Sequence, residues 1–179
     1  MSTRHLIVVD IESTGLDPKV HVPIEIAAIN VDTGQTLIFA PYLTPEQILN
    51  VDPEALRINR YYERGVYKTA EKSEVANTNR YISLWNMLRG NTFAGANPRF
   101  DADMLVAATN MKPSWNYRLA DVSAYVAGAL GIYPAEIPGL HDCCERLGVV
   151  NDAEHSALGD AKATAECFRI AEAIGRRNA

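Results

Sequence analysis

The stretch LIVVDIESTG, residues 6–15, places four apolar residues directly before two carboxylates and a turn. The apolar run does not alternate with polar residues, which predicts a strand over residues 5–12 that is buried on both faces. Side chains alternate along a strand, so Asp10 and Glu12 point to the same side, about 6.6 Å apart along the chain. Two carboxylates at that spacing repel each other unless a cation lies between them or one is protonated. The alternative is a solvated strand end before a turn, which a short D-x-E motif taken alone would favour.

The composition is that of an ordinary globular protein. The chain has 179 residues, of which 47% are hydrophobic and 22% charged, and we expect residues 1–179 to form a single domain. Its apolar runs are too short to cross a bilayer, and its first residues do not form a signal peptide, so a cytoplasmic location without a membrane partner is expected. Cys143, Cys144 and Cys167 form no C-x-x-C pair and are expected to be reduced, half-buried thiols. The net charge of −5 argues against a coat protein for nucleic acid, which would normally be basic, but not against an enzyme that holds metal ions with clustered acids.

The segments after the first strand predict an α/β protein. PIEIAAINV (23–31) and TLIFAPYL (36–43) read as strands joined by the short turn DTGQ, so the first three strands form an antiparallel meander. Further strands are predicted over 91–97 and 117–122, and helices near Pro53 and over 71–90, 98–110, 123–131, 139–148 and 157–176. In the 71–90 helix, the apolar residues at helical spacing are Val75, Tyr81, Ile82, Trp85 and Leu88. A meander followed by alternating strands and helices predicts a mixed central sheet flanked by helices.

Asp101 lies on the apolar face of the helix that Asn97 is expected to cap. With the register set in this way, Asp101 shares the face of Met104 and Leu105, which packs on the sheet, whereas Asp103 lies on the solvated side. An acid that only complements the helix dipole is common, but it need not occupy the buried face.

Asp160 repeats this pattern in the last predicted helix. It shares a face with Cys167 and Phe168, and burying its charge is unfavourable unless the charge is paired or bound to a metal. Ser156 suits the N-cap, which leaves His155 in the preceding loop, free to lean over the same site. A histidine in a polar loop is more often only solvated, so the position of Asp160 decides the interpretation. The other histidines lack a comparable partner and are interpreted as structural: His5, His21 and His141.

Four carboxylates from three elements, Asp10, Glu12, Asp101 and Asp160, can hold two hard cations, which prefer oxygen ligands. Two such ions stabilise the attacking and the leaving oxygen of a displacement at phosphorus. A nearby histidine can deprotonate the attacking water, which is the role open to His155.

Three segments, VDIESTG, NPRFD and HSALGD, resemble the three motifs of the DEDD superfamily of 3′→5′ exonucleases, in the order found there. A histidine five residues before the last aspartate is typical of the histidine-type branch, which includes bacterial proofreading subunits, RNase T and oligoribonuclease. The resemblance covers nearly all of the chain, and it implies a ribonuclease H-like fold that binds two Mg²⁺ or Mn²⁺ ions. It implies that Asp10 bridges both metals, that Glu12 and Asp160 complete the metal on the nucleophile side, and that Asp101 holds the other. His155 would be the general base.

The same resemblance implies contacts with the substrate. The turn Ser13, Thr14, Gly15 and Leu16 would face the terminal nucleotide, with backbone N–H groups for the 3′-hydroxyl and Leu16 against the bases. Phe100 would pack against the terminal base or sugar. Asn97, Pro98 and Arg99 depart from the His-Asn often seen in the family, so no substrate role is assigned to Asn97.

A second candidate surface for nucleic acid lies between residues 57 and 72. This segment has a net charge of +3 and three tyrosines, a combination that suits single strands. Its members are Arg57, Arg60, Arg64, Lys68, Lys72, Glu63, Glu71, Tyr61, Tyr62 and Tyr67. The alternative is a solvated helix and loop.

These patterns favour a metal-dependent 3′→5′ exonuclease that releases nucleoside 5′-monophosphates from single-stranded ends, with DNA favoured. RNA stays open, because no residue identifies a contact to a 2′-hydroxyl. One alternative is an auxiliary module that binds nucleic acid or a polymerase, and another is an endonuclease of ribonuclease H type. A polymerase and a second copy of the chain are candidate partners.

Overall fold

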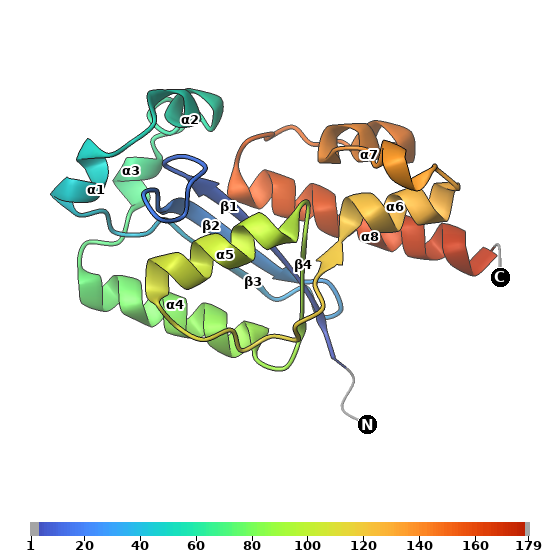
Figure 1. Cartoon of the computed structure of the whole chain (residues 1–179), viewed down its shortest axis with the longest axis horizontal. Helices are drawn as coiled ribbons and strands as arrows, with labels where there is room; N and C mark the ends of the chain where they lie inside the picture. The colour runs from blue at the N-terminus through green and yellow to red at the C-terminus, as the bar shows by residue number, and fades with distance from the viewer. Residues whose placement is uncertain (1–3, 178–179) are drawn as a thin grey trace.

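The computed structural model describes residues 4–177 and contains a five-stranded mixed sheet in the order β3-β2-β1-β4-β5 (Figure 1). β1 (Leu6–Ser13) pairs antiparallel with β2 (Pro23–Asn30), and β2 pairs antiparallel with β3 (Thr36–Phe39). β4 (Thr92–Gly95) lies parallel to β1, and β5 (Ala120–Asp121) lies parallel to β4. This arrangement confirms the predicted meander followed by parallel strands.

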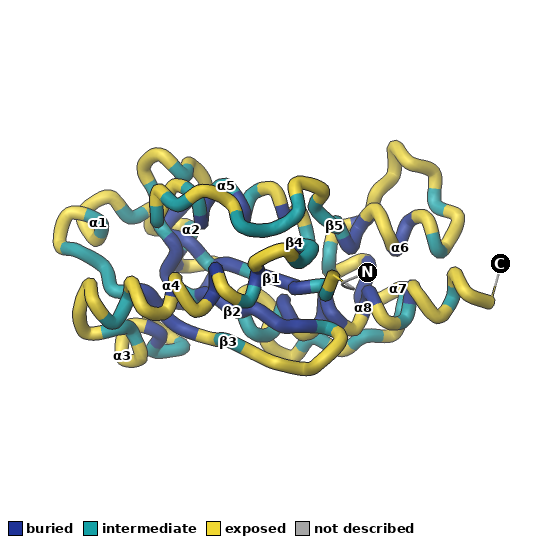
Figure 2. Tube along the Cα trace, turned by 90° about the horizontal axis from the view of Figure 1, so that it is seen from below, coloured by how far each residue is buried: buried dark blue, intermediate teal, exposed yellow. Residues whose placement is uncertain are grey.

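Two layers of helices cover the sheet, and β1 separates their cores. One face carries α4 (Glu74–Leu88) and α5 (Pro98–Thr109), and the other carries α6 (Val122–Leu130), α7 (Leu140–Leu147) and α8 (Ala157–Arg177). Ile7, Val9 and Ile11 belong to the first core, whereas Val8 belongs to the second. Figure 2 shows these buried strands between helices whose outer surfaces are exposed. Because side chains alternate, Asp10 and Glu12 continue the row of Val8 on the α8 face.

β1 extends beyond the end of β4, so its last residues, which include Asp10 and Glu12, have a neighbouring strand on one side only. The pairing of β1 with β4 ends at Val8 and Ala94, whereas β1 stays paired with β2 as far as Ser13. The two backbones are close where they part, because a Cβ added at Gly95 would lie 2.9 Å from the carbonyl oxygen of Val9. α5 starts three residues after β4 ends, so its first turn meets the part of β1 that has no β4 partner.

The segment between β3 and α4 contains three short helices, of which only α2 (Pro53–Ile58) was predicted. α1 (Pro45–Leu49) starts with a capping box, in which the Thr44 hydroxyl accepts from the N–H of Gln47 and the Gln47 side chain accepts from the N–H of Thr44. The T-x-x-Q pattern is therefore a signal that could have revealed α1. α3 (Val66–Thr69) has four residues, too few for a periodic pattern. A 3₁₀ helix, η1 (Pro134–Glu136), precedes α7.

The third and fifth strands are shorter than predicted. β3 ends at Phe39, shortly before Pro41, which cannot donate to a strand ladder. β5 ends at Asp121, whose carboxylate accepts from the N–H groups of Ser123 and Ala124 and so caps α6. β5 therefore ends at Asp121 because this residue caps the helix that follows.

The α4 helix is present, but the predicted apolar face was partly wrong. Tyr81, Leu84, Trp85 and Leu88 are buried, whereas Val75 and Ile82 are exposed. Ile82 lies about 200° around the helix from Leu84, and Val75, seven residues before Ile82, lies on that same outer side.

Two further observations concern the helices. All three cysteines are free and buried, rather than half-buried as expected, because α7 and α8 pack against each other. The sulfur atoms of Cys144 and Cys167 lie 3.8 Å apart across these two helices.

Within residues 4–177, no helix combines the length and the apolar character needed to cross a membrane.

Candidate metal centre

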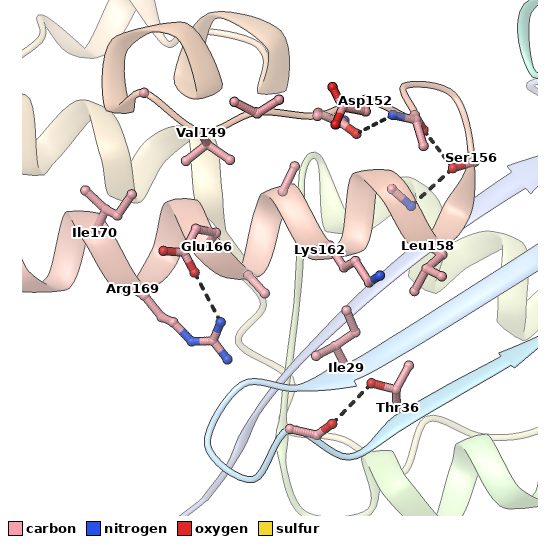
Figure 3. A pocket seen from close by; sticks show the side chains of 18 residues that line it. Ile29, Thr36, Val149, Asp152, Ser156, Leu158, Lys162, Glu166, Arg169 and Ile170 are labelled. Atoms are coloured by element: carbon pink, nitrogen blue, oxygen red, sulfur yellow. Dashed lines mark hydrogen bonds and ion pairs between the residues drawn. The ribbon is translucent and has the colours of Figure 1, made fainter.

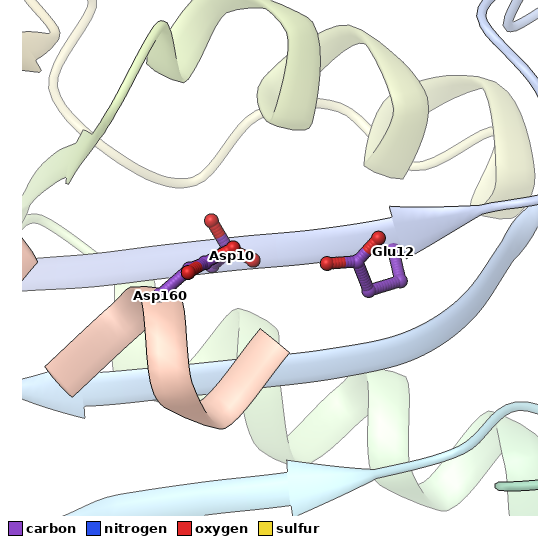
Figure 4. A group of neighbouring side chains, drawn as sticks. All are labelled: Asp10, Glu12 and Asp160. Carbon is purple, nitrogen blue, oxygen red and sulfur yellow. The ribbon is translucent and has the colours of Figure 1, made fainter. Parts of the chain in front are cut away.

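Asp10, Glu12 and Asp160 converge at the carboxyl end of β1. Each side chain offers one oxygen atom, and these oxygens all lie within 4.8 Å of one another. Asp10 and Glu12 project from β1, whereas Asp160 projects from the first turn of α8 (Figure 4). Two elements that are distant in the sequence thus bring three carboxylates together, and we call these three residues the acidic group.

Asp101 borders the acidic group from the first turn of α5. Its side chain is buried, with 4% of the residue exposed, as its place on the apolar helix face predicts. It is not one of the residues whose oxygens converge within 4.8 Å. However, the backbone of Ile11 lowers the pKa of Asp101, and the charge of Asp101 raises that of Asp10, so the two elements lie close together. Asn97 precedes this helix as predicted, but its backbone is left-handed and its side chain makes no capping bond.

Burial and mutual repulsion raise the pKa values of Asp10 and Asp101. The pKa of Asp10 lies well above its ordinary value, chiefly because the carboxyl group is buried and then because Asp101, Asp160 and Glu12 repel its charge. Burial also raises the pKa of Asp101, although backbone hydrogen bonds oppose this shift. These carboxyl groups are therefore hard to ionise without a positive charge nearby.

Glu12 and Asp160 show the same effect. Burial is the main cause that raises the pKa of Glu12 to about 7, helped by the charges of Asp160 and Glu25, while Arg64 opposes the shift. Burial also raises the pKa of Asp160. A bound divalent cation would remove this repulsion, and the all-oxygen donor set fits a hard ion.

The loop before α8 holds Asp160 in place. One carboxylate oxygen accepts from Nδ2 of Asn151 at 2.7 Å, and the other accepts from the backbone N–H of His155 at 3.2 Å. Ser156 caps the helix as predicted, since its hydroxyl accepts from the N–H of Gly159 at 3.2 Å. His155 is exposed and left-handed, with φ 59°. The loop thus places the backbone of His155 beside Asp160, while the role of its imidazole stays a prediction.

The turn after β1 is held by internal hydrogen bonds. The backbone N–H of Thr14 donates to the Val22 carbonyl at 2.9 Å, and its hydroxyl accepts from the Val22 N–H at 3.0 Å. The Ser13 hydroxyl donates to the Gly15 carbonyl at 2.7 Å. The hydroxyl groups of Ser13 and Thr14 therefore already have partners inside the turn, whereas Leu16 is 80% exposed.

Close packing explains the glycine in this turn. A Cβ added at Gly15 would come within 2.5 Å of the ring of His21, so a side chain at residue 15 would require this ring to move. Phe100 lies half-buried in the first turn of α5. The nucleotide contacts assigned to Ser13, Thr14, Gly15, Leu16 and Phe100 stay predictions.

The prediction that the remaining histidines lack comparable partners was wrong for His5 and His141, whereas His21 lies 3.4 Å from the hydroxyl of Thr14. The Nδ1 atom of His5 lies 3.0 Å from a carboxylate oxygen of Asp32, and that of His141 lies 2.7 Å from a carboxylate oxygen of Glu154. These partners come from other loops and elements, so no local sequence pattern marks them. Both contacts join separate segments, which agrees with a structural role.

Glu25 is part of this site, although the sequence analysis did not single it out. It lies directly across from Glu12 in the β1–β2 register, and its charge raises the pKa values of Asp10 and Glu12. Its side chain accepts hydrogen bonds from Arg64 and from the first residue of α8. The segment PIEIAAI carries Glu25 on a predicted strand, but its proximity to Glu12 depends on the strand register.

The basic and aromatic segment 57–72 carries less free charge than predicted. Arg57 and Arg64 form ion pairs with acids that lie outside the segment. Tyr61 is buried, whereas Tyr62 and Tyr67 are exposed and pack their rings 5.2 and 6.2 Å from that of Tyr61. Glu54 lies three residues before Arg57 and could have been recognised as an i,i+3 partner, whereas Glu25 is distant from Arg64 in the sequence.

A cavity of about 730 Å³ lies between α8, the loop 148–153 and the β2–β3 turn (Figure 3). Lys162, Glu166 and Arg169 line it from α8, together with the loop 148–153. None of the four predicted acids lines it. This cavity is therefore separate from the candidate metal centre.

The fold and the acidic group define an α/β protein with a candidate centre for divalent metal. Residues 7–168 match the exonuclease family named after RNase T, and the chain belongs to this family. This finding confirms the predicted resemblance to DEDD 3′→5′ exonucleases, while the histidine-type branch stays a prediction.

Individual relatives agree with this assignment. A 78-residue segment is 38% identical to the oligoribonuclease of Buchnera aphidicola subsp. Acyrthosiphon pisum (strain APS), covering 41% of each chain. The fold is similar to that of E. coli exonuclease I in a zinc-bound complex with single-stranded DNA, with a TM-score of 0.74 and 21% identity over 98% of this chain and 42% of that chain. A product-bound exonuclease I gives a TM-score of 0.71 at 19% identity, over 98% of this chain and 45% of that one. The chain thus spans less than half the length of these relatives.

Stability of the metal-free protein should fall as the pH rises. The pKa of Glu12 is about 7 in the folded state and 4.5 ordinarily, so the folded state binds the proton more tightly between these values. Ionising Glu12 should therefore lower the free energy of unfolding by roughly 3 kcal/mol between pH 4.5 and 7. Thermal denaturation at a series of pH values measures this loss, and Mg²⁺ or Mn²⁺ should reverse it near pH 7.5.

The matched variant is Glu12→Gln, which cannot ionise. It should show a flatter dependence of Tm on pH and a smaller rise in Tm with metal. Identical pH profiles for the variant and the unaltered protein would contradict the repulsion described here.

Proposed function

We propose that this chain is a metal-dependent 3′→5′ exonuclease that releases nucleoside 5′-monophosphates from single-stranded nucleic acid. The observation that carries the proposal is the convergence of Asp10, Glu12 and Asp160 within 4.8 Å in a chain of the exonuclease family. Similarity to an oligoribonuclease and to exonuclease I bound to single-stranded DNA supports a single-stranded substrate.

The acidic group supplies ligands for Mg²⁺ or Mn²⁺, because such ions prefer carboxylate oxygens. When bound, a pair of these ions would stabilise both the attacking and the leaving oxygen at phosphorus. Asp10 is repelled by Asp101, Asp160 and Glu12, so it is the acid that the charges of all three others affect, and we assign it as the ligand that would serve both ions. Glu12 and Asp160 would then complete one metal site, and Asp101 would support the other.

His155 is the proposed general base. Its backbone N–H donates to Asp160 at 3.2 Å, so the imidazole belongs to a residue that is fixed to a metal-binding carboxylate. An imidazole can accept a proton from water near neutral pH. The left-handed backbone of His155 is unusual for a residue with a side chain, and the hydrogen bonds of the loop hold it there.

Two apolar residues that lie close to the acidic residues in the sequence are candidates to contact the end of the strand. Leu16 is exposed after the turn that follows Glu12, and Phe100 precedes Asp101. We propose that these residues pack against the terminal bases. DNA is the favoured polymer because the relatives with similar structure hold DNA, and the oligoribonuclease similarity makes RNA the alternative. A homodimer and a polymerase partner stay predictions.

Replacement of a metal ligand should abolish most of the activity. Asp10→Asn and Asp160→Asn keep the side-chain shape but remove a charge that holds the ions, so the rate should fall about 10²–10³-fold. The measurement is release of mononucleotides from matched single-stranded DNA and RNA oligomers in Mg²⁺ or Mn²⁺. Asp103→Asn, on the outer side of α5 where it pairs with Arg99, should leave the rate unchanged.

A wild-type rate in Asp10→Asn or Asp160→Asn would contradict the metal centre. The same assay separates the exonuclease from an endonuclease. A circular single strand has no 3′ end and should stay intact, and cutting of the circle would favour a ribonuclease H-type endonuclease instead.

Replacement of the general base should slow the chemical step alone. His155→Ala should reduce the single-turnover rate about 10²–10⁴-fold, because no other group takes the proton from water as readily. Its affinity for Mn²⁺, measured by calorimetry, should stay close to that of the unaltered protein. His5→Ala is the control, since this histidine pairs with Asp32 at the end of β1 opposite to the acidic group. Loss of metal affinity without a slower chemical step would contradict the assigned role.

A further inference from the structure

Glu25 and Arg64 form an ion pair beside the acidic group. The Nη2 atom of Arg64 donates to Oε2 of Glu25 at 2.6 Å, and the side chains are 15% exposed for Glu25 and 23% exposed for Arg64. Glu25 lies across from Glu12 on the neighbouring strand. The same Oε2 accepts from the backbone N–H of Ala157, the first residue of α8, at 3.2 Å. Glu25 therefore joins β2 to the helix that bears Asp160.

Arg64 extends this connection to the end of β1. Its Nε donates to the backbone carbonyl of Asn59 at 2.8 Å, and Nδ2 of Asn59 donates to the backbone carbonyl of Ser13 at 3.3 Å. Ser13 directly follows Glu12. A continuous series of hydrogen bonds thus runs from the start of α8, through Glu25, Arg64 and Asn59, to the strand that bears Glu12.

Stability alone does not account for this series. Asn59 is 2% exposed, and its Oδ1 atom has no hydrogen-bond partner in the part of the chain that the structure describes. A buried acceptor without a partner destabilises the folded state. A largely buried ion pair is also often no more stable than apolar residues of similar volume. The unpaired oxygen of Asn59 and the largely buried ion pair are both explained if these residues serve to hold β1 and α8 at fixed positions.

The charges of the pair act on the acidic group in opposite senses. Glu25 repels Asp10 and Glu12, whereas Arg64 attracts Glu12. Because the two charges balance, the pair can fix the distance between β1 and α8 without changing the net charge of the site.

We infer that Glu25, Arg64 and Asn59 position the candidate metal centre by holding Glu12 and Asp160 at the separation that a divalent cation requires. They are positioning residues, because they act through the metal ligands. Groups that orient metal ligands typically change metal affinity about 10–100-fold. The inference rests on the proposed function, since it presumes that the acidic group binds metal.

The double variant Glu25→Leu/Arg64→Met tests this inference. It removes one negative and one positive charge, so the net charge is kept while the hydrogen bonds to Ala157 and Asn59 are lost. The Kd for Mn²⁺, measured by calorimetry, should rise about tenfold or more. The Tm of the metal-free protein, measured alongside, reports how far the lost hydrogen bonds destabilise the fold independently of metal binding.

The matched control is Glu71→Leu/Arg80→Met, which removes a 2.7 Å ion pair at the start of α4. It should leave the Kd for Mn²⁺ unchanged. Wild-type affinity for Mn²⁺ in Glu25→Leu/Arg64→Met would overturn the inference.

A second variant decides the question if the double variant does not fold. Arg64→Lys keeps the positive charge, but a single ammonium group cannot reproduce the two bonds that the guanidinium makes to Glu25 and Asn59. Its Kd for Mn²⁺ should rise several-fold, and an unchanged Kd would contradict the inference. If the unaltered protein did not bind Mn²⁺, the proposed function itself would fail, which is a different result.

Discussion

Repulsion among carboxylates that lie within 4.8 Å of one another is the constraint on which the whole site depends. The two apolar cores fix β1 between the helix layers, and the alternation of its side chains then directs Asp10 and Glu12 toward α8. Packing of α8 brings Asp160 to the same point. Hydrophobic burial thus holds the carboxylates together although their charges repel one another, and a bound divalent cation would offset this repulsion.

The residues around the acidic group keep that arrangement rigid from both sides. The loop before α8 fixes Asp160 with hydrogen bonds from Asn151 and from the backbone of His155. Glu25 connects the other end of the site to the first residue of α8. These contacts explain how a group of like charges can be held ready for metal by polar side chains that do not themselves need to bind it.

Local patterns were enough to predict the positions of the candidate metal ligands, because strand alternation and helix periodicity decide which way a side chain points. Asp10 and Glu12 follow from the first rule, and Asp101 and Asp160 from the second. Glu25 was not identified because its distance from Glu12 depends on the β1–β2 register across a turn of irregular conformation. The partners of His5, His141 and Arg64 were missed for the same physical reason, since they are contacts between segments that only the folded chain brings together.

The most direct test of the account is to locate the metal in crystals of the protein that contain Mn²⁺. Anomalous scattering identifies the ion independently of any assumption about the site. The account predicts an anomalous peak in contact with Asp10, Glu12 and Asp160. Crystals with saturating Mn²⁺ and no peak among these three carboxylates would contradict it.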